Sequence, residues 1–272
     1  MPEQPVAAIT GASSGIGRQT ALAFARRGYA VLLAARREDE LRKAADECRA
    51  CGGAAEVCPT DVADERQVRA MVSGAVDRFG RLDVMVNNAG YGVSGQVHEL
   101  TDERLRGIFD VNFFGLFYGC KAAAEVMIRQ KSGHIFNVSS IIGKRGTPYN
   151  GAYCATKFAV IGLTDSMRVE LRPHGVHVTA VCPGLTDTEF FENVRGGSSA
   201  GKSSFKMVRT MQPASRVAEG IVRAAGKHRP QITFTAGGKL LVAVNDLSPG
   251  LADRILEHYR RDVAWREQEG AP

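Results

Sequence analysis

The sequence has no apolar run near the ~18 residues that a membrane-spanning helix needs. Its first ten residues also lack the basic and then apolar pattern of a secretory signal. We therefore expect a cytoplasmic protein without a transmembrane segment. No run of five or more basic residues occurs, although Lys and Arg outnumber Asp and Glu by 35 to 29. Because no basic patch with interleaved aromatic residues is present, nucleic acid is not an expected partner.

The chain has few cysteines for its length, six in 272 residues, and several lie in apolar segments, as reduced core thiols do. Cys48 and Cys51 form a C-x-x-C pair late in an expected helix. A redox pair belongs at a helix N-terminus, where the dipole stabilises the thiolate. We therefore expect no redox chemistry from this pair, and we expect no metal site.

Short apolar segments alternate with longer amphipathic ones over the first 182 residues. This alternation predicts parallel strands joined by helices, in one doubly wound α/β domain over residues 1–272. We expect about seven strands with helices on both faces, and helices starting near Ile16, Arg37, Asp64, Thr101 and Gly151. The expected strands are 6–10, 30–34, 54–58, 83–87, 133–139, 176–182 and 231–235. A helix is expected from Pro213 to about Lys227, and a helical extension over residues 237–272, broken at Ser248-Pro249-Gly250.

The first strand runs into the glycine-rich segment 10–17, TGASSGIG, and an expected helix follows. Glycines there allow a tight turn and the close approach of a pyrophosphate to the helix N-terminus. The same residues fit the nucleophile motif G-x-S-x-G, which would make Ser13 a hydrolase nucleophile. That alternative lacks an upstream loop for an oxyanion hole and a histidine in a distinctive context. The segment therefore favours a dinucleotide site.

The acidic residue that NAD enzymes usually carry after the second strand is absent. Arg36 and Arg37 follow Ala35 instead. A guanidinium at this position can bind a ribose 2′-phosphate in a bidentate manner. We therefore predict that the cofactor is NADP(H) rather than NAD(H).

Tyr153 and Lys157 are four residues apart at the start of an expected helix, so they share one face. Ser140 ends the fifth expected strand, at the sheet edge where parallel sheets present functional groups. Asn112 lies in the middle of an expected helix, although its helix propensity is low.

These residues resemble the short-chain dehydrogenase/reductase family, whose motifs occur here in the family's order between residues 5 and 190. The matches are TGASSGIG at 10–17, Asp61-Val62, Asn87-Asn88-Ala89-Gly90, Asn112, Ser140, Tyr153, Lys157, Pro183-Gly184 and Thr188. The resemblance implies a Rossmann-type fold, a homodimer or homotetramer, and hydride transfer between a nicotinamide and a carbonyl or alcohol.

The resemblance also implies a role for each matching residue. Tyr153 would be the general acid/base, and Lys157 would lower its pKa and bind the nicotinamide ribose. Ser140 would bind the substrate oxygen, and Asn112 would hold a water that links Lys157 to solvent. The implied cofactor contacts are Gly11, Ser13, Ser14, Gly15, Ile16 and Gly17 at the phosphates, Arg36 and Arg37 at the 2′-phosphate, Asp61 and Val62 at the adenine, Asn88, Ala89 and Gly90 along the ribose and diphosphate, and Pro183, Gly184, Thr186 and Thr188 at the nicotinamide.

The resemblance is weakest after residue 190. Residues 189–212 are expected to form a substrate lid, and its Phe and Met residues favour an apolar substrate, although they are equally consistent with core packing. The apolar stripe of the C-terminal extension allows a cap on its own domain, a dimer interface or a membrane-surface contact. The expected pocket wall is Tyr91, Val93, Ser94, Ile142, Tyr149 and Asn150. A cofactor-binding protein without turnover is the remaining alternative to an enzyme.

Overall fold

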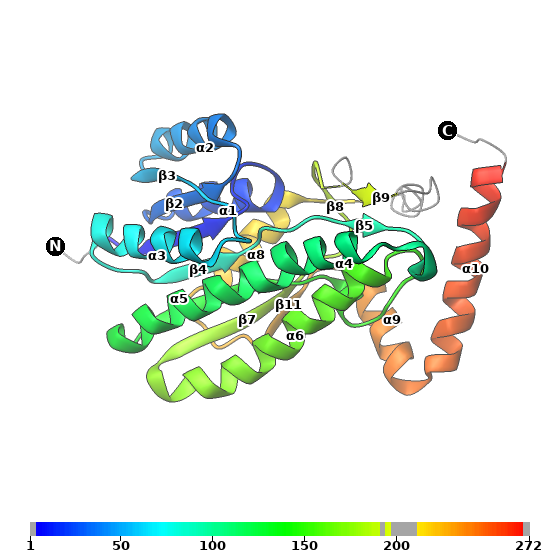
Figure 1. Cartoon of the computed structure of the whole chain (residues 1–272). Coiled ribbons are helices and arrows are strands. Elements are labelled where there is room, and N and C mark those ends of the chain that lie inside the picture. Colours follow the sequence, from blue (N-terminus) through cyan, green and yellow to red (C-terminus); the bar gives the residue numbers. More distant parts are fainter. Residues whose placement is uncertain (1–3, 191–193, 197–210, 269–272) are drawn as a thin grey trace.

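A seven-stranded, all-parallel sheet forms the centre of the computed structural model, which describes residues 4–190, 194–196 and 211–268 (Figure 1). Its strand order is β11-β7-β6-β4-β1-β2-β3. The doubly wound α/β fold is thus confirmed, and each expected strand is present within two residues of its expected bounds. The strands are β1 (Val6–Thr10), β2 (Ala30–Ala35), β3 (Ala55–Pro59), β4 (Val84–Asn87), β6 (Gly133–Val138), β7 (Val176–Cys182) and β11 (Gln231–Thr233).

Helices cover both faces of this sheet. On one face lie α1 (Gly15–Ala25), α2 (Glu38–Ala50) and α8 (Ala214–Ala224), and on the other α3 (Glu65–Phe79), α5 (Gly115–Gln130) and α6 (Gly151–Leu171). In β1, Val6 and Ala8 join one core cluster while Ala7 and Ile9 join the other. Both faces are buried because side chains alternate across a strand, so the central strands are apolar throughout.

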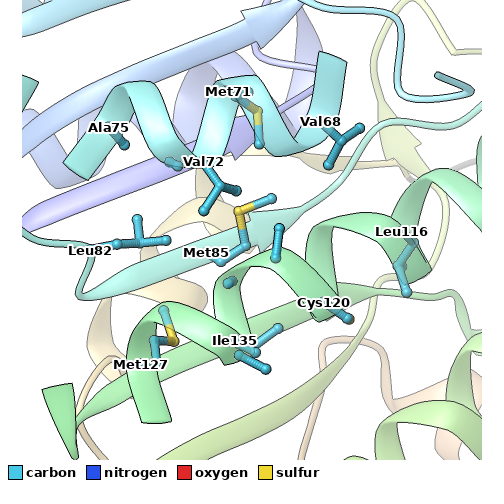
Figure 2. Packing of buried hydrophobic residues seen from close by; sticks show 14 of the residues in the cluster. Val68, Met71, Val72, Ala75, Leu82, Met85, Leu116, Cys120, Met127 and Ile135 are labelled. Carbon is cyan, nitrogen blue, oxygen red and sulfur yellow. The ribbon is translucent and has the colours of Figure 1, made fainter. Parts of the chain in front are cut away.

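The core on the α3 and α5 face is made of interdigitating aliphatic and sulfur-containing side chains. Figure 2 shows Met85 of β4 between Val72 of α3 and the side chains of α5. Met71, Met85 and Met127 are fully buried. Unbranched methionines fill irregular gaps between helices and sheet, so they pack β4 tightly against α3 and α5.

The five expected helix starts are confirmed to within one residue, and two of these helices are capped by a side chain. Asp64 accepts a hydrogen bond from the amide of Arg66 and Thr101 from that of Arg104. One continuous helical stretch begins with α4 (Asp102–Phe109) and ends with α5. The two helices are joined by η2 (Asp110–Phe114), which is a π-turn. Among the described residues this stretch, Asp102–Gln130, is long and apolar enough to span a membrane, but 56% of its most apolar window is buried. α5 packs on β4 and β6, which accounts for its apolar composition.

Two C-terminal helices follow the last strand, α9 (Ala236–Leu247) and α10 (Pro249–Gln268), with the expected break at Ser248. They stand together at one end of the molecule (Figure 1). In the expected apolar stripe Leu256 is buried, whereas Leu247 is 88% exposed. Of the expected lid, residues 191–193 and 197–210 lie outside the described part of the chain.

Candidate active site

A cavity of about 1240 Å³ lies at the carboxyl ends of the strands, where the strand order reverses between β1 and β4. The structure brings nearly all the predicted site residues to this cavity. Of the predicted catalytic and cofactor-binding residues, only Gly17 and Asn112 do not line it. Gly17 lies beneath the glycine turn and Asn112 is completely buried.

The glycine turn after β1 requires glycine at its positions. Gly11 has φ 67° and Gly15 has φ 53°, values that L side chains rarely adopt. A Cβ on Gly17 would lie 2.2 Å from the carbonyl oxygen of Gly11. α1 therefore starts directly at the turn, and the first amides of a helix, which have no partner within the helix, favour an anion.

The end of β1 is tied to the end of β4 by Thr10, a residue whose role we did not predict. Its hydroxyl accepts hydrogen bonds from the amides of Asn88 at 2.9 Å and Ala89 at 3.1 Å. The Asn88 amide group donates to the carbonyl of Thr10 at 3.0 Å. These bonds hold the Asn88–Gly90 segment against the glycine turn, which explains why both segments line one cavity.

The two arginines after β2 differ in their surroundings. Arg36 is exposed at the cavity rim. Arg37 folds back onto the glycine turn, where its Nη2 lies 2.9 Å from the Ser14 hydroxyl and 3.3 Å from that of Ser13. The same nitrogen is 2.9 Å from a carboxylate oxygen of Glu189. Asp61 and Val62 line the cavity after β3.

Tyr153 and Lys157 share one face at the start of α6 and are almost completely buried. The Lys157 ammonium donates to the carbonyl of Val138 at 2.9 Å and lies 5.5 Å from the centroid of the Tyr153 ring. The Ser140 hydroxyl is hydrogen-bonded to the Tyr153 side chain. Three of the four predicted catalytic groups therefore meet at the floor of the cavity.

The expected lowering of the Tyr153 pKa is not found in the chain alone. Burial raises the pKa of Tyr153 above that of a free phenol, and its hydrogen bond with Ser140 offsets only part of this rise. Burial lowers the pKa of Lys157 to about 8. Both changes have one cause, because a water-poor site disfavours the charged form of each group.

Asn112 lies in the π-turn, which the sequence did not reveal. The amide of Gly115 donates to the carbonyl of Asp110, five residues earlier. The Asn112 side chain accepts from the amide of Tyr91 at 3.0 Å, donates to its carbonyl at 2.9 Å, and donates to Thr156 at 3.3 Å. Asn112 therefore fixes the backbone beside Gly90, whose Cβ position lies 3.7 Å from the Lys157 ammonium. Such turns are frequent at functional sites.

The segment after β7 closes the opposite wall. The Pro183 carbonyl accepts from the amide of Ile141 at 2.9 Å, which joins this segment to the turn after Ser140. Thr186 donates to the Gly184 carbonyl at 2.9 Å and accepts from Gln212 at 3.2 Å. A Cβ added to Gly15 would lie only 3.0 Å from the methyl group of Thr188, so this segment packs closely on the glycine turn.

The substrate end of the cavity differs in part from the expected wall. Tyr91, Ile142 and Asn150 line it as expected. Val93, Ser94 and Tyr149 do not: Val93 and Ser94 are buried in a short strand, β5 (Val93–Ser94), and Tyr149 has φ 65°. Phe190 and Met211, from the segment whose Phe and Met residues favoured an apolar substrate surface, do line the cavity. Apolar residues that we did not assign to the wall also line it, namely Phe234, Leu241, Ile255 and Leu256.

The alternatives based on serine and cysteine chemistry lose support. No histidine among the described residues lines the cavity, so Ser13 has no base beside it. Its hydroxyl accepts from Arg37 instead. Cys48 is buried, and burial raises its pKa to about 12, which disfavours the thiolate that redox chemistry needs.

Comparisons with known proteins agree with this geometry. The family model described as short chain dehydrogenase matches residues 5–198. The oxidoreductase YxnA of Bacillus subtilis is 35% identical over 93% of this chain and 71% of its own length. Galactitol 2-dehydrogenase of Agrobacterium fabrum is 38% identical over 70% of this chain and 73% of its own length.

Two solved structures share the fold. A short-chain dehydrogenase/reductase from Burkholderia phymatum in complex with NAD has a TM-score of 0.85 and 28% identity, over 92% of this chain and 96% of that one. An alcohol dehydrogenase from Thermococcus sibiricus, complexed with 5-hydroxy-NADP, has a TM-score of 0.74 and 30% identity, over 85% of this chain and 96% of that one. The chain therefore belongs to the short-chain dehydrogenase family, oxidoreductases that transfer hydride with NAD(P).

Proposed function

We propose that this chain is an NADP(H)-dependent oxidoreductase that interconverts a carbonyl and a secondary alcohol on an apolar small molecule. One observation carries the proposal, which is the position of Tyr153 in the cavity between the glycine turn and an apolar wall. There it is hydrogen-bonded to Ser140 and lies beside Lys157. A substrate oxygen that reaches Tyr153 from the apolar end would have a proton donor and a hydroxyl beside it.

The residues present fit a dinucleotide. A Cβ on Gly11 would lie 2.8 Å from the Asn88 amide nitrogen, and one on Gly17 would lie 2.2 Å from the Gly11 carbonyl oxygen, so only glycine allows the turn to pack this tightly. α1 begins at this turn, and a helix N-terminus beside a glycine turn suits a pyrophosphate. In this proposal Asp61 and Val62 hold the adenine, Asn88, Ala89 and Gly90 follow the ribose and diphosphate, and Pro183, Gly184, Thr186 and Thr188 hold the nicotinamide. When bound, the nicotinamide supplies or accepts the hydride.

The protein's own groups move the proton. In the reducing direction the Tyr153 hydroxyl donates its proton to the substrate oxygen, while the Ser140 hydroxyl donates a hydrogen bond to the same oxygen. Lys157 has a pKa of about 8, so it is mostly protonated at pH 7 and its charge stabilises the phenolate left behind. Asn112 orders the backbone beside Lys157, where a water could return the proton.

The preference for NADP(H) is supported by charge and position. Arg36, not an acidic residue, directly follows β2, and it lies at the cavity rim. The guanidinium of Arg37 lies against the Ser13 and Ser14 hydroxyls. Two cations and two hydroxyls suit a ribose 2′-phosphate.

An apolar substrate is supported by the wall from Phe190 to the C-terminal helices, in which Phe190 lies 5.5 Å from Tyr153 between ring centroids. A homo-oligomer is supported by the exposed rings of Phe114, Phe117 and Phe158. We place this oligomer in the cytoplasm.

The test is oxidation of NADPH against a panel of apolar ketones, aldehydes and acyl thioesters, with Tyr153→Phe beside the wild type. We expect turnover on at least one substrate class and a loss of about 10²–10⁴-fold in kcat for the variant, because the proton donor is gone. NADPH binding, followed by fluorescence, should be retained. Tight binding of NADPH without turnover on any substrate would contradict an enzymatic role and favour a cofactor-binding protein.

A further inference from the structure

The Arg37 nitrogen that faces the glycine turn is already paired with a carboxylate of the protein, that of Glu189. Arg37 Nη2 lies 2.9 Å from the Glu189 carboxylate and 2.9 Å from the Ser14 hydroxyl. Arg37 and Glu189 are 152 residues apart. Glu189 directly follows Thr188, so the ion pair joins the proposed 2′-phosphate site to the segment proposed to hold the nicotinamide.

We propose that Glu189 is a specificity-determining residue that competes with the ribose 2′-phosphate for Arg37. The inference rests on the NADP(H) preference proposed above. A phosphate bound between Ser14 and Arg37 would need the same N–H groups that Glu189 uses, and its negative charge would repel the carboxylate. NADP(H) must therefore displace Glu189 from Arg37, whereas NAD(H), which has no 2′-phosphate, leaves the ion pair intact.

The ion pair is weak enough to be displaced. The Arg37 and Glu189 side chains are 49% and 45% exposed, and exposed ion pairs contribute little because water screens them. A phosphate dianion is a stronger acceptor than a carboxylate and meets the Ser13 and Ser14 hydroxyls as well. The predicted effect of Glu189 is consequently a moderate reduction of NADP(H) affinity rather than its loss.

The test measures cofactor binding by calorimetry in the absence of substrate, so that it does not depend on turnover. Glu189→Gln should lower the Kd for NADPH threefold to tenfold and change the Kd for NADH less than twofold. Asp187→Asn is the matched control, because it removes one exposed negative charge two residues away, at a residue not bonded to Arg37. It should change both Kd values less than twofold.

Arg37→Gln separates this inference from the proposed cofactor preference. It should weaken NADPH binding at least tenfold, and Glu189→Gln should then have no further effect in the double variant. If the wild type prefers NADPH and Arg37→Gln weakens it, but Glu189→Gln leaves its Kd unchanged, the role of Glu189 is overturned and the preference stands. Equal gains from Glu189→Gln and Asp187→Asn, or equal gains for NADPH and NADH, would also overturn it. A wild type without a preference for NADPH would overturn the cofactor proposal itself.

Discussion

Arg145 and Asp253, 108 residues apart in the chain, form an ion pair that joins the loop after Ser140 to α10. The same guanidinium donates to the Asn245 side chain in α9 at 3.0 Å. The Arg145 side chain is only 19% exposed, so its contacts are less screened than those of a surface arginine. A single residue in the loop after Ser140 thus holds both C-terminal helices at the apolar end of the cavity.

Loss of the Arg145 contacts with the two C-terminal helices should affect substrate binding more than the chemical step. We expect Arg145→Ala to raise KM for an apolar substrate about fivefold to twentyfold, because Leu241 and Leu256 lose their fixed positions in the wall. Hydrogen exchange of residues 236–256 should be faster, while kcat changes less. Arg254→Ala, which removes an exposed arginine from the same helix, is the control. An unchanged KM and unchanged exchange in Arg145→Ala would contradict a role of this ion pair in holding the helices.

Lys157 should lower the free energy of unfolding of the protein, although turnover depends on it. Its pKa is lowered by burial from 10.5 to about 8, so the folded state disfavours its charge. We expect Lys157→Met to abolish turnover and to raise the free energy of unfolding at pH 7 by about 1–3 kcal/mol. Urea unfolding measures this change, with the exposed Lys239→Met as control.

The pH dependence of the same lysine has a defined sign. Between pH 8 and 10.5 the unfolded chain binds the proton that folded Lys157 has released, so this residue makes stability rise with pH in that window. Lys157→Met should lack this rise. A variant with the wild-type slope would show that Lys157 is not the group responsible.

His134 should make the fold sensitive to acid. Its Nδ1 accepts from the amide of Gly226 at 3.2 Å, so its Nε2 donates to Thr179 at 2.8 Å and the ring is neutral. Burial lowers the His134 pKa to about 3. The unfolded chain therefore binds a proton as pH falls below about 6.5, and stability should decrease by about 2 kcal/mol between pH 6.5 and 5.

Chemical unfolding at several pH values checks this expectation. His134→Asn should have a flatter pH dependence than the wild type, although it is less stable at pH 7. His98→Asn, at an exposed histidine, should retain the wild-type slope. Equal slopes in all three proteins would assign the acid sensitivity to other groups.

Gly17→Ala should damage the fold and the cofactor site together. Its Cβ would lie 2.2 Å from the Gly11 carbonyl and 2.7 Å from the Asn88 amide nitrogen, so the turn must shift. We expect a destabilisation of about 1–3 kcal/mol and an NADPH Kd at least tenfold higher. Gly74→Ala in α3 is the control, because nothing lies within 4 Å of its Cβ position. That variant should be neutral or stabilised by up to about 1 kcal/mol.

The sequence predicted the elements that follow from local patterns. Strand bounds, the caps at Asp64 and Thr101, and the glycine turn depend on neighbouring residues, so they were visible without a structure. Arg37 and Glu189 are 152 residues apart in the chain, and Arg145 and Asp253 are 108 apart. Asn112 and Thr156 are 44 apart. No local sequence pattern predicts such pairs. The sequence also did not indicate that burial raises the pKa of Tyr153 in the chain alone, because burial is a tertiary property.

The wall of the cavity shows the same limit. Val93 and Ser94 were expected in it, but they form the paired strand β5 and are buried. The C-terminal helices were recognised as helices, yet their position over the cavity depends on contacts with the loop after Ser140. Sequence therefore located the cofactor half of the site more completely than the substrate half.

The π-turn at Asp110–Phe114 makes the reactive site sensitive to the number of residues as well as to their identity. Each residue of an α-helix advances the direction of its side chain by about 100°, and the wider turn accommodates one additional residue. Deleting Asp110 or Val111 would restore a regular helix and rotate Asn112 away from Tyr91 and Thr156. The loss of one in-frame codon would thus displace Asn112 while Ser140, Tyr153 and Lys157 are retained, and the insertion of one codon there would return Asn112 to its place.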